Sequence, residues 1–394
     1  MREVVLAGVV RTAVGSFGGT LRDTPAVDLG ALVIKEAIKR AGIAPDQVDE
    51  VLMGCVIQAG LGQNVARLAT LKAGLPHTVP AQTINIVCGS GLNSVNMAAL
   101  AVASGQVDVM VAGGMENMSM GPYAITKARY GYRMGAGTLM DTMINDALTD
   151  VLLNIHMGVT AENVAEKYGI TREQQDEFAA WSQNKAEAAI KGGKFKEQIV
   201  PVEIKVKKDI VPFDTDEFPR AGVTAESLKG LPTAFKKDGG TVTPGNASGI
   251  NDGAAAMVVM CAKKAKELGV KPMARWIGGA LGGVDPAIMG IGPVDATNKL
   301  FKRTGLTMAD MDIVEANEAF AAQALAVGKL LEIPNEKLNP NGGAIAIGHP
   351  VGASGTRILT TLLYELKLQG KKKGLATLCV GGGQGVSMIV ENLA

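Results

Sequence analysis

Short apolar runs alternate with helix-like segments over the first part of the chain. Four runs are typical of buried strands, namely Val4–Val10, Val51–Ile57, Thr83–Val87 and Asp108–Ala112. Three intervening segments place their apolar residues at helical spacing, namely Thr24–Gly42, Asn64–Ala73 and Leu92–Ala103. This alternation predicts an α/β fold with a mostly parallel sheet that is covered by helices.

The pattern changes at about Ser119. Residues 119–249 are more polar and less regular, and they contain one clear amphipathic helix. Thr171 opens that helix with a capping box, and Gly192 ends it. We interpret this stretch as an inserted domain, because the alternating pattern returns at Ala254–Met260 and continues to the end of the sequence.

Two short segments near the N-terminus resemble two segments near the C-terminus. Ala44–Val51 matches Thr307–Val314 at an offset of 263 residues, and Val109–Gly114 matches Thr377–Gly382 at an offset of 268 residues. Weak similarity at a nearly constant offset predicts two related halves, with chance similarity as the alternative.

Composition and charge narrow the class of protein. A chain of 394 residues suffices for about two or three domains. Its 39 basic and 38 acidic residues leave a net charge of +1, so no global field attracts nucleic acid or an anionic membrane. No apolar stretch is expected to reach the roughly 18 residues of a membrane span. No targeting signal is recognised either, so the expected location is the cytoplasm.

Motifs for common cofactors and metals are missing. The four cysteines form no CxxC pair, and there is no GxxxxGK[ST], no HExxH and no GxGxxG after the first strand. We therefore expect neither a metal site nor a redox cofactor.

Cys88 stands where a predicted strand meets a predicted helix, in Ile-Val-Cys-Gly-Ser-Gly-Leu. A strand–turn–helix junction presents a nucleophile at the tip of a sharp turn. The N–H groups and partial positive charge of the helix terminus are expected to lower the pKa of this thiol. The alternative is a small buried hydrophobic residue.

Three more residues at loops and strand ends are candidates for chemistry. His349 lies in a loop rich in Gly, Pro and Asn before a predicted helix, and it is either a base or a structural histidine. Cys379 ends a predicted strand before Val-Gly-Gly-Gly, whose N–H groups can serve as oxyanion donors, although a core cysteine is the simpler interpretation. Asn317 either caps a helix or holds a water that donates to an oxyanion.

Five segments, taken in order, resemble the signatures of the thiolase family. They are Cys88-Gly-Ser-Gly, Gly113-Gly-Met-Glu-Asn-Met-Ser, Asn317-Glu-Ala-Phe, Gly348-His-Pro-Val-Gly-Ala-Ser-Gly and Cys379-Val-Gly-Gly-Gly-Gln-Gly. The resemblance covers essentially the whole chain. His156-Met157-Gly158 is similar to the segment found in the biosynthetic, short-chain members.

The resemblance implies a five-layered αβαβα arrangement of two duplicated halves with an inserted loop domain. The N-terminal half would comprise residues 1–118 and 250–270, the loop domain residues 119–249, and the C-terminal half residues 271–394. It also implies a homotetramer that is a dimer of dimers. We expect the irregular stretch Gly121–Asp141 to make the contact between dimers.

By the same resemblance, the activity would be that of an acetyl-CoA C-acetyltransferase. Such an enzyme converts two acetyl-CoA to acetoacetyl-CoA and CoA through an acetyl-cysteine, so CoA thioesters are substrates and no cofactor is needed. The alternatives are a longer-chain 3-ketoacyl-CoA thiolase of fatty-acid degradation and a non-catalytic acyl-CoA or lipid carrier. A ketoacyl-carrier-protein synthase is disfavoured, since Cys379 stands where those enzymes normally have histidine.

Roles can be carried over residue by residue. Cys88 would be the acylated nucleophile, Cys379 the acid and base, and His349 the group that activates Cys88. His349 and a water on Asn317 would hold the enolate oxygen, while the N–H groups of Cys88 and Gly381 would form a second oxyanion hole. Ser248 would contact the pantetheine arm and Arg220 would lie near the CoA phosphates. The pocket would be lined by His156, Met157, Met289, Ala319 and Phe320.

Cys88 and Cys379 would both reach one small substrate, so we expect their sulfur atoms within several ångströms of each other. Oxidation would then give either a reversible disulfide between them or a sulfenic acid at Cys88 alone.

Overall fold

Two half-sheets form the centre of the protein in the computed structural model, which describes all 394 residues. The first half-sheet contains, in spatial order, β1 (Val4–Arg11), β12 (Asn251–Cys261), β5 (Val109–Asn117), β3 (Glu50–Gly54) and β4 (Ala81–Ile84). The second contains β13 (Ala274–Gly283), β16 (Gln384–Asn392), β15 (Lys373–Val380) and β14 (Ile313–Ala316). A short contact between β1 and β13, together with β2 (Gly15–Ser16) beside β12, makes them one continuous ten-stranded sheet.

The two half-sheets repeat one topology. Counted outward from β1 in the first half-sheet and from β13 in the second, the first two strand pairings are antiparallel and the third is parallel. The first half adds the parallel pair β3–β4, and the second half has a parallel bridge between Val314 and Leu338 at the same place. Short 3₁₀ helices at Pro45–Gln47 and Met308–Asp310 lead into β3 and β14, which confirms the predicted internal repeat. The sheet is mixed rather than mostly parallel, because β12 and β16 return beside the first strand of each half.

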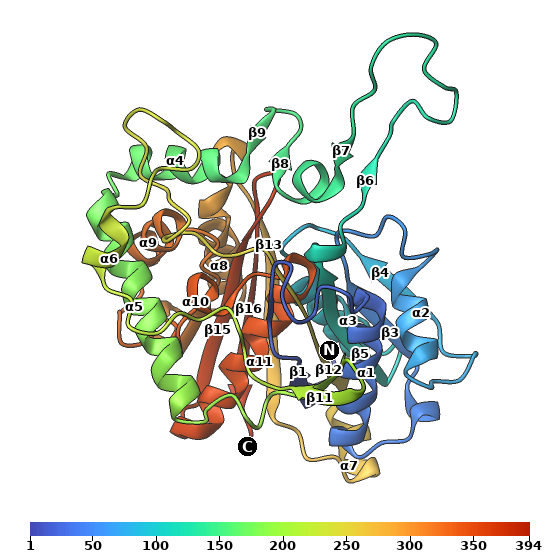
Figure 1. The fold of residues 1–394 in the computed structure, drawn as a ribbon. Coiled ribbons are helices and arrows are strands. Elements are labelled where there is room, and N and C mark those ends of the chain that lie inside the picture. The colour runs from blue at the N-terminus through green and yellow to red at the C-terminus, as the bar shows by residue number, and fades with distance from the viewer.

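Helices cover the half-sheets on both faces (Figure 1). The outer layers consist of α1 (Ala26–Ala41) and α2 (Val65–Lys72) on the first half-sheet, and α8 (Gly292–Thr304) and α9 (Ala321–Leu330) on the second. Between the half-sheets, α3 (Ser90–Ser104) and α11 (Val351–Gln369) pack against each other. Three large hydrophobic cores lie between these layers. The predicted five-layered arrangement is therefore confirmed.

The predicted helices begin and end close to where the sequence places them. α1 follows Pro25 and ends at Gly42, whose φ of 71° is the left-handed conformation that glycine adopts readily. In α5 (Arg172–Lys191), Thr171 and Gln174 form the predicted capping box, and Gly192 follows the last turn. Capping groups satisfy N–H groups that a helix terminus leaves unpaired, so these local signals set the helix boundaries.

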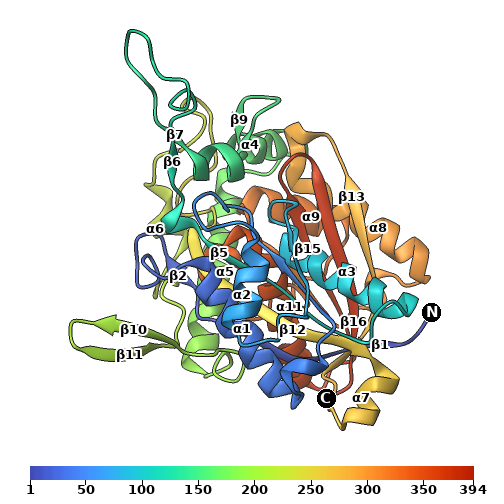
Figure 2. The same ribbon diagram turned by 90° about the vertical axis from the view of Figure 1, so that its right-hand side faces the viewer.

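Residues 119–249 carry mainly short elements around one end of the sheet. They are β6 (Tyr123–Ala124), β7 (Met140–Asp141), β8 (Thr149–Asp150), β9 (Ile155–His156), α4 (Met157–Tyr168), α5, β10 (Val202–Val206), β11 (Asp209–Phe213) and α6 (Ala225–Lys229). Residues 125–139, between β6 and β7, project from the body as an arm (Figure 1). The β10–β11 hairpin projects separately (Figure 2). Two short helices complete the fold, α7 (Ala262–Leu268) after β12 and α10 (Ala344–Ile347) before α11.

Two strands end earlier than their apolar runs. β3 ends at Gly54 rather than Ile57, because the N–H groups of Val56 and Ile57 donate to the Glu116 carboxylate. β4 ends at Ile84 rather than Val87, and beyond it the N–H of Ile86 donates to the Ser90 hydroxyl. A side chain thus replaces the neighbouring strand as acceptor at both places, and the chain is free to turn.

One segment is long and apolar enough to cross a membrane by length and composition. It is Val87–Ser104, with a mean hydropathy of 1.2, so the expectation that no such stretch exists is wrong. Within the fold 67% of it is buried, and it forms the turn at Cys88 and helix α3 of the central layer. Burial between two half-sheets demands the same apolar composition as a lipid environment does.

Candidate active site

A cavity of about 270 Å³ lies where residues from both halves and the inserted region meet, and its lining is mostly apolar. Of the predicted site residues, it is lined by Cys88, His156, Met157, Ser248, Met289, Ala319, Phe320, His349 and Cys379. Sequence reasoning did not identify its other lining residues, which are Met118, Ile144, Ala147, Leu148, Ala234, Phe235, Thr243, Pro244, Ala247, Gly249, Ile250 and Val351. Residues separated by up to 291 positions in sequence therefore share one pocket.

Cys88 occupies a sharp turn between β4 and α3. Val87, just before it, has a φ of 51°, which a β-branched residue adopts only under strain of about 1–3 kcal/mol. The Ser90 hydroxyl donates to the Val87 carbonyl at 2.6 Å and holds the turn closed. The predicted nucleophile-presenting junction is therefore present, and its side chain reaches the cavity wall.

The pKa of the Cys88 thiol is raised to about 11, contrary to the expectation that the helix terminus lowers it. Burial raises this pKa more than the N–H groups of Gly381 and of Cys88 itself lower it. Both N–H groups nevertheless lie at the sulfur, which suits an oxyanion hole at this position. Cys88 is therefore a neutral thiol at neutral pH, and its attack on a thioester requires a base.

His349 is oriented as such a base. Ser354 donates its hydroxyl proton to the Pro350 carbonyl at 2.8 Å, so its oxygen accepts from Nδ1–H of His349 at 2.6 Å. This tautomer leaves Nε2 unprotonated, and Nε2 accepts a hydrogen bond from the amide nitrogen of Asn317 at 3.5 Å. Burial, with a smaller contribution from Arg357, lowers the pKa of His349 to about 3 and keeps the ring neutral. A neutral imidazole with an unprotonated Nε2 can accept a proton.

Asn317 follows β14 and is buried beside His349. Its main-chain N–H donates to the Thr377 carbonyl, while its side-chain oxygen is buried without a hydrogen-bond partner. Asn317 does not line the cavity directly. A buried unpaired oxygen behind the cavity wall is compatible with the expected role as the anchor of a water.

Cys379 lies near the end of β15 and is fully buried. Burial, and to a smaller extent Cys88, raise the pKa of its thiol, and both cysteines line the same cavity. A thiol of raised pKa is a strong base once it has lost its proton. The following turn contains Gly382 and Gly383 at φ 80°, which only glycine adopts readily, and it brings the Gly381 N–H to the Cys88 sulfur.

His156 and Ser248 also line the cavity. His156 caps α4 by accepting the Gly158 N–H at Nδ1, and its ring stacks on Phe235 at 4.8 Å. Ser248 donates its N–H to the Ala319 carbonyl at 2.9 Å, which ties its segment to the loop after Asn317. Met157, Met289, Ala319 and Phe320 pack in one cluster with Cys379.

Arg220 is the predicted CoA-binding residue that does not line the cavity. Its side chain is exposed, with the guanidinium 5.8 Å from the Phe218 ring centre, and it is not among the lining residues. Its expected place near CoA phosphates stays a prediction. No group of three or more His, Cys, Asp or Glu residues is arranged to hold a metal ion.

Glu116 is a buried residue of the site that sequence reasoning missed, although it lies inside one of the quoted motifs. Its carboxylate accepts N–H groups from Val56 at 3.0 Å, Ile57 at 3.1 Å and Gly352 at 2.9 Å. Gly352 lies in the first turn of α11, just after His349. Burial raises the pKa of Glu116 to about 7, although these three N–H donors lower it. The sequence signal that could have identified Glu116 is a charged residue at the end of an otherwise apolar strand.

Comparisons with known proteins agree with this geometry. Residues 4–263 match the family model described as "Thiolase, N-terminal domain", and residues 270–392 match "Thiolase, C-terminal domain". The chain is similar to an acetyl-CoA acetyltransferase of Cupriavidus necator, at 59% identity over 99% of this chain and 100% of the relative. It is also similar to one of Syntrophomonas wolfei, at 57% identity over all of both chains. The crystal structure of the Bacillus anthracis acetyl-CoA acetyltransferase superimposes with a TM-score of 0.97, at 48% identity over 100% of this chain and 99% of that chain. The chain therefore belongs to the thiolase family.

Proposed function

We propose that this protein is an acetyl-CoA C-acetyltransferase that condenses two acetyl-CoA to acetoacetyl-CoA and CoA, reversibly, through an acetyl group on Cys88. The observation that carries the proposal is the convergence of Cys88, Cys379, His349 and the N–H of Gly381 at one small apolar cavity. The full-length similarity to enzymes named acetyl-CoA acetyltransferases supports the choice of substrate.

The first half-reaction transfers an acetyl group to the protein. Nε2 of His349 takes the Cys88 proton as the sulfur attacks the thioester carbonyl. The N–H groups of Cys88 and Gly381 stabilise the oxyanion that forms on that carbonyl. The thiolate of CoA then leaves with a proton from the Cys379 thiol, so the product is acetyl-Cys88, protonated His349 and the Cys379 thiolate.

The second half-reaction forms the carbon–carbon bond. The Cys379 thiolate removes a proton from the α-carbon of a second acetyl-CoA, and its raised pKa makes it a suitable base. Nε2–H of His349 and a water on Asn317 stabilise the enolate oxygen. The enolate carbon attacks acetyl-Cys88 and expels the Cys88 thiolate, which recovers its proton from His349. Each protein group ends with the proton count it started with, because the α-proton of the second acetyl-CoA replaces the proton that Cys379 gave to CoA.

The proposal includes the assembly and the setting of the enzyme. We propose a homotetramer, supported by the arm at residues 125–139, which exposes large apolar side chains such as Tyr130 and Met134. CoA thioesters are its substrates, no further cofactor takes part, and neither nucleic acid nor membrane is a partner. The proposed location is the cytoplasm, on the grounds of sequence given above.

The two cysteines should have separable roles. Cys88→Ala should abolish acetylation of the protein by acetyl-CoA. Cys379→Ala should still become acetylated at Cys88, because the leaving CoA thiolate can take its proton from water. It should fail to form acetoacetyl-CoA, because the second half-reaction needs a base that removes the α-proton. Intact-mass and peptide mass spectrometry measure the acetyl group, and an enzyme-coupled assay measures the condensation.

Cys261 supplies the matched control, since it is a buried cysteine that does not line the cavity. Cys261→Ala should be acetylated and turn over like the wild-type protein. Acetylation of the cavity that persists in Cys88→Ala would overturn the assignment. The alternative activity on longer chains predicts a higher kcat/KM for 3-ketooctanoyl-CoA than for acetoacetyl-CoA, and our proposal predicts the reverse order.

A further inference from the structure

Residues 229–246 form one wall of the cavity without contributing to its chemistry. Ala234, Phe235, Thr243 and Pro244 from this segment line the cavity. Phe235 lies between two other lining rings, stacked on His156 at 4.8 Å and edge-on to Phe320 at 6.3 Å. The position of this segment therefore decides the shape of the cavity on that side.

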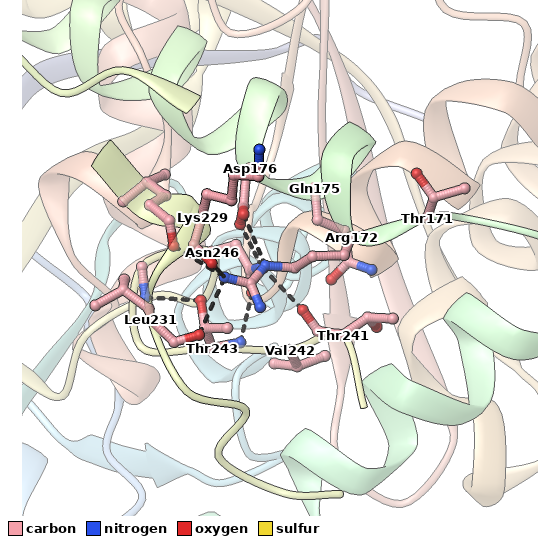
Figure 3. A network of polar contacts seen from close by, with 12 residues as sticks. Thr171, Arg172, Gln175, Asp176, Lys229, Leu231, Thr241, Val242, Thr243 and Asn246 are labelled. Atoms are coloured by element: carbon pink, nitrogen blue, oxygen red, sulfur yellow. Dashed lines mark hydrogen bonds and ion pairs between the residues drawn. The ribbon is translucent and has the colours of Figure 1, made fainter. Parts of the chain in front are cut away.

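One ion pair on helix α5 holds both ends of the segment (Figure 3). At the first end, the Arg172 guanidinium donates to the carbonyl oxygens of Leu228 at 2.9 Å, Lys229 at 3.3 Å and Leu231 at 3.2 Å. Arg172 also donates to Asp176, one turn along the helix, at 2.7 Å. The other oxygen of Asp176 accepts from the Asn246 side chain at 2.9 Å, which is the second end.

Asn246 connects Asp176 to the rest of the wall segment through further hydrogen bonds. Its amide nitrogen also donates to the Thr241 carbonyl at 3.1 Å, and its amide oxygen accepts the Thr243 N–H at 2.8 Å. Its main-chain carbonyl accepts the N–H of Ala321 at 2.9 Å, in the first turn of α9. Asn246 therefore connects the wall segment to the loop that carries Ala319 and Phe320.

The Asp176 carboxylate suits this place because it only accepts hydrogen bonds. Its side chain is 4% exposed, and each oxygen receives a donor, Arg172 on one side and Asn246 on the other. An amide of the same shape would turn its NH₂ group toward one of these donors. One end of the wall segment would then lose its contact and leave a buried polar group unpaired.

We propose that Arg172 and Asp176 are positioning residues that clasp residues 229–246 and thereby set the affinity of the cavity for CoA thioesters. Neither residue lines the cavity, so both act through the segment. The inference rests on the proposed function, because it takes the occupant of the cavity to be the acyl and pantetheine part of a CoA thioester. The catalytic groups lie on other elements, so the clasp affects binding more than chemistry.

The test compares Asp176→Asn with Glu177→Gln. Glu177 is the exposed neighbour on the same helix, has no hydrogen bond or ion pair, and loses the same charge. Asp176→Asn should raise the KM for acetoacetyl-CoA by about tenfold or more, as expected for a lost hydrogen bond to a buried charge. Its kcat should stay within about twofold of the wild-type value. Glu177→Gln should match the wild-type protein in both constants.

Two readouts do not depend on turnover. The rate at which iodoacetamide alkylates Cys88 should be unchanged in Asp176→Asn, which shows that the catalytic turn is intact. Trypsin should cleave after Lys236 or Lys237 faster in Asp176→Asn than in Glu177→Gln, because both lysines are exposed within the segment that the variant releases. CoA should slow this cleavage.

Failure of the clasp and failure of the proposed function give different results. A wild-type protein that does not turn over acetoacetyl-CoA overturns the proposed function. The clasp is overturned if the wild-type protein is active but Asp176→Asn equals Glu177→Gln in KM and in cleavage rate. It is also overturned if the rate of Cys88 alkylation in Asp176→Asn falls in parallel with its activity. If Asp176→Asn does not fold, Arg172→Lys takes its place. Lysine can still pair with Asp176 but cannot reach three carbonyls, so the KM and cleavage rate should rise in the same direction.

Discussion

The acidity of single side chains decides how this site can work. The helix terminus at Cys88 predicts a reactive thiolate, yet burial in an apolar cavity outweighs two N–H donors and raises its pKa to about 11. His349 is shifted in the opposite direction, to a pKa of about 3, because burial disfavours its charged form as well. The resting pair is therefore a neutral thiol and a neutral imidazole, and the proton moves only when a substrate is attacked.

Alkylation of Cys88 by iodoacetamide should accelerate with pH through pH 9 and pH 10. A thiol whose pKa is near 11 has a small thiolate fraction at neutral pH, and that fraction rises about tenfold per pH unit below the pKa. Mass spectrometry of the Cys88 peptide gives the rate at each pH, with a model thiol treated in parallel. A plateau that is reached below pH 8 would contradict the raised pKa and restore the thiolate that the helix terminus predicts.

Glu116→Gln should lower kcat by about tenfold and reduce the melting temperature. The carboxylate accepts three main-chain N–H groups, and a glutamine must turn its NH₂ group toward at least one of them. Because Gly352 is one of these donors, the first turn of α11 and the adjacent His349 should shift. Steady-state kinetics and thermal unfolding measure the two effects. Glu267→Gln on the exposed side of α7 is the control, and equal kcat values for the two variants would refute the positioning role.

Two features stand out among the secondary-structure elements: the central helices that the two halves repeat, and the projecting arm at residues 125–139. The repeat is visible in α3 and α11, which occupy matching places in the central layer and whose first turns lie at Cys88 and His349. Duplication thus places two helix N-termini at one cavity, one after the proposed nucleophile Cys88 and one after the proposed base His349. The arm at residues 125–139 has no counterpart in the second half, and its exposed apolar residues are unexplained by the fold of a single chain.

Replacing residues 125–139 by a short Gly-Ser linker should convert the proposed tetramer into a dimer. Burial of side chains such as Tyr130, which is 94% exposed, and Met134, which is 89% exposed, would supply the contact between dimers. Multi-angle light scattering gives the mass. The control is Ile210→Ser on the projecting β10–β11 hairpin, which should leave the mass unchanged. A wild-type monomer, or a deletion variant that remains tetrameric, would contradict this assignment.

The arrangement of all layers explains why neither half could carry out the reaction alone. The proposed nucleophile, Cys88, comes from the N-terminal half, while His349, Asn317 and Cys379 come from the C-terminal half. The wall with Phe235 and Ser248 comes from residues that the sequence sets apart as an insertion. The proposed reaction needs an acyl acceptor, a base and two oxyanion sites within one small volume, and only the packed halves together supply them.

Local sequence determined much of this protein. Capping groups at Thr171, glycines at helix ends such as Gly42 and apolar periodicity act over a few residues, so they predicted most helices and the strands' positions. The offset repeats predicted the duplicated halves, and five motifs indicated the family and the residues that meet at the cavity. Each of these features depends on interactions between near neighbours in the chain or on a recognisable string of residues.

Only the tertiary structure decided the rest, because it depends on partners far apart in sequence. The C-terminal end of β3 follows from a carboxylate 60 residues away, and we infer that the wall at Phe235 follows from an ion pair on α5. The acidity of Cys88 was predicted in the wrong direction because a helix terminus is visible in the sequence, whereas the depth of burial is not. Solvent exclusion is a property of packed layers, and it sets the protonation state on which the chemistry depends.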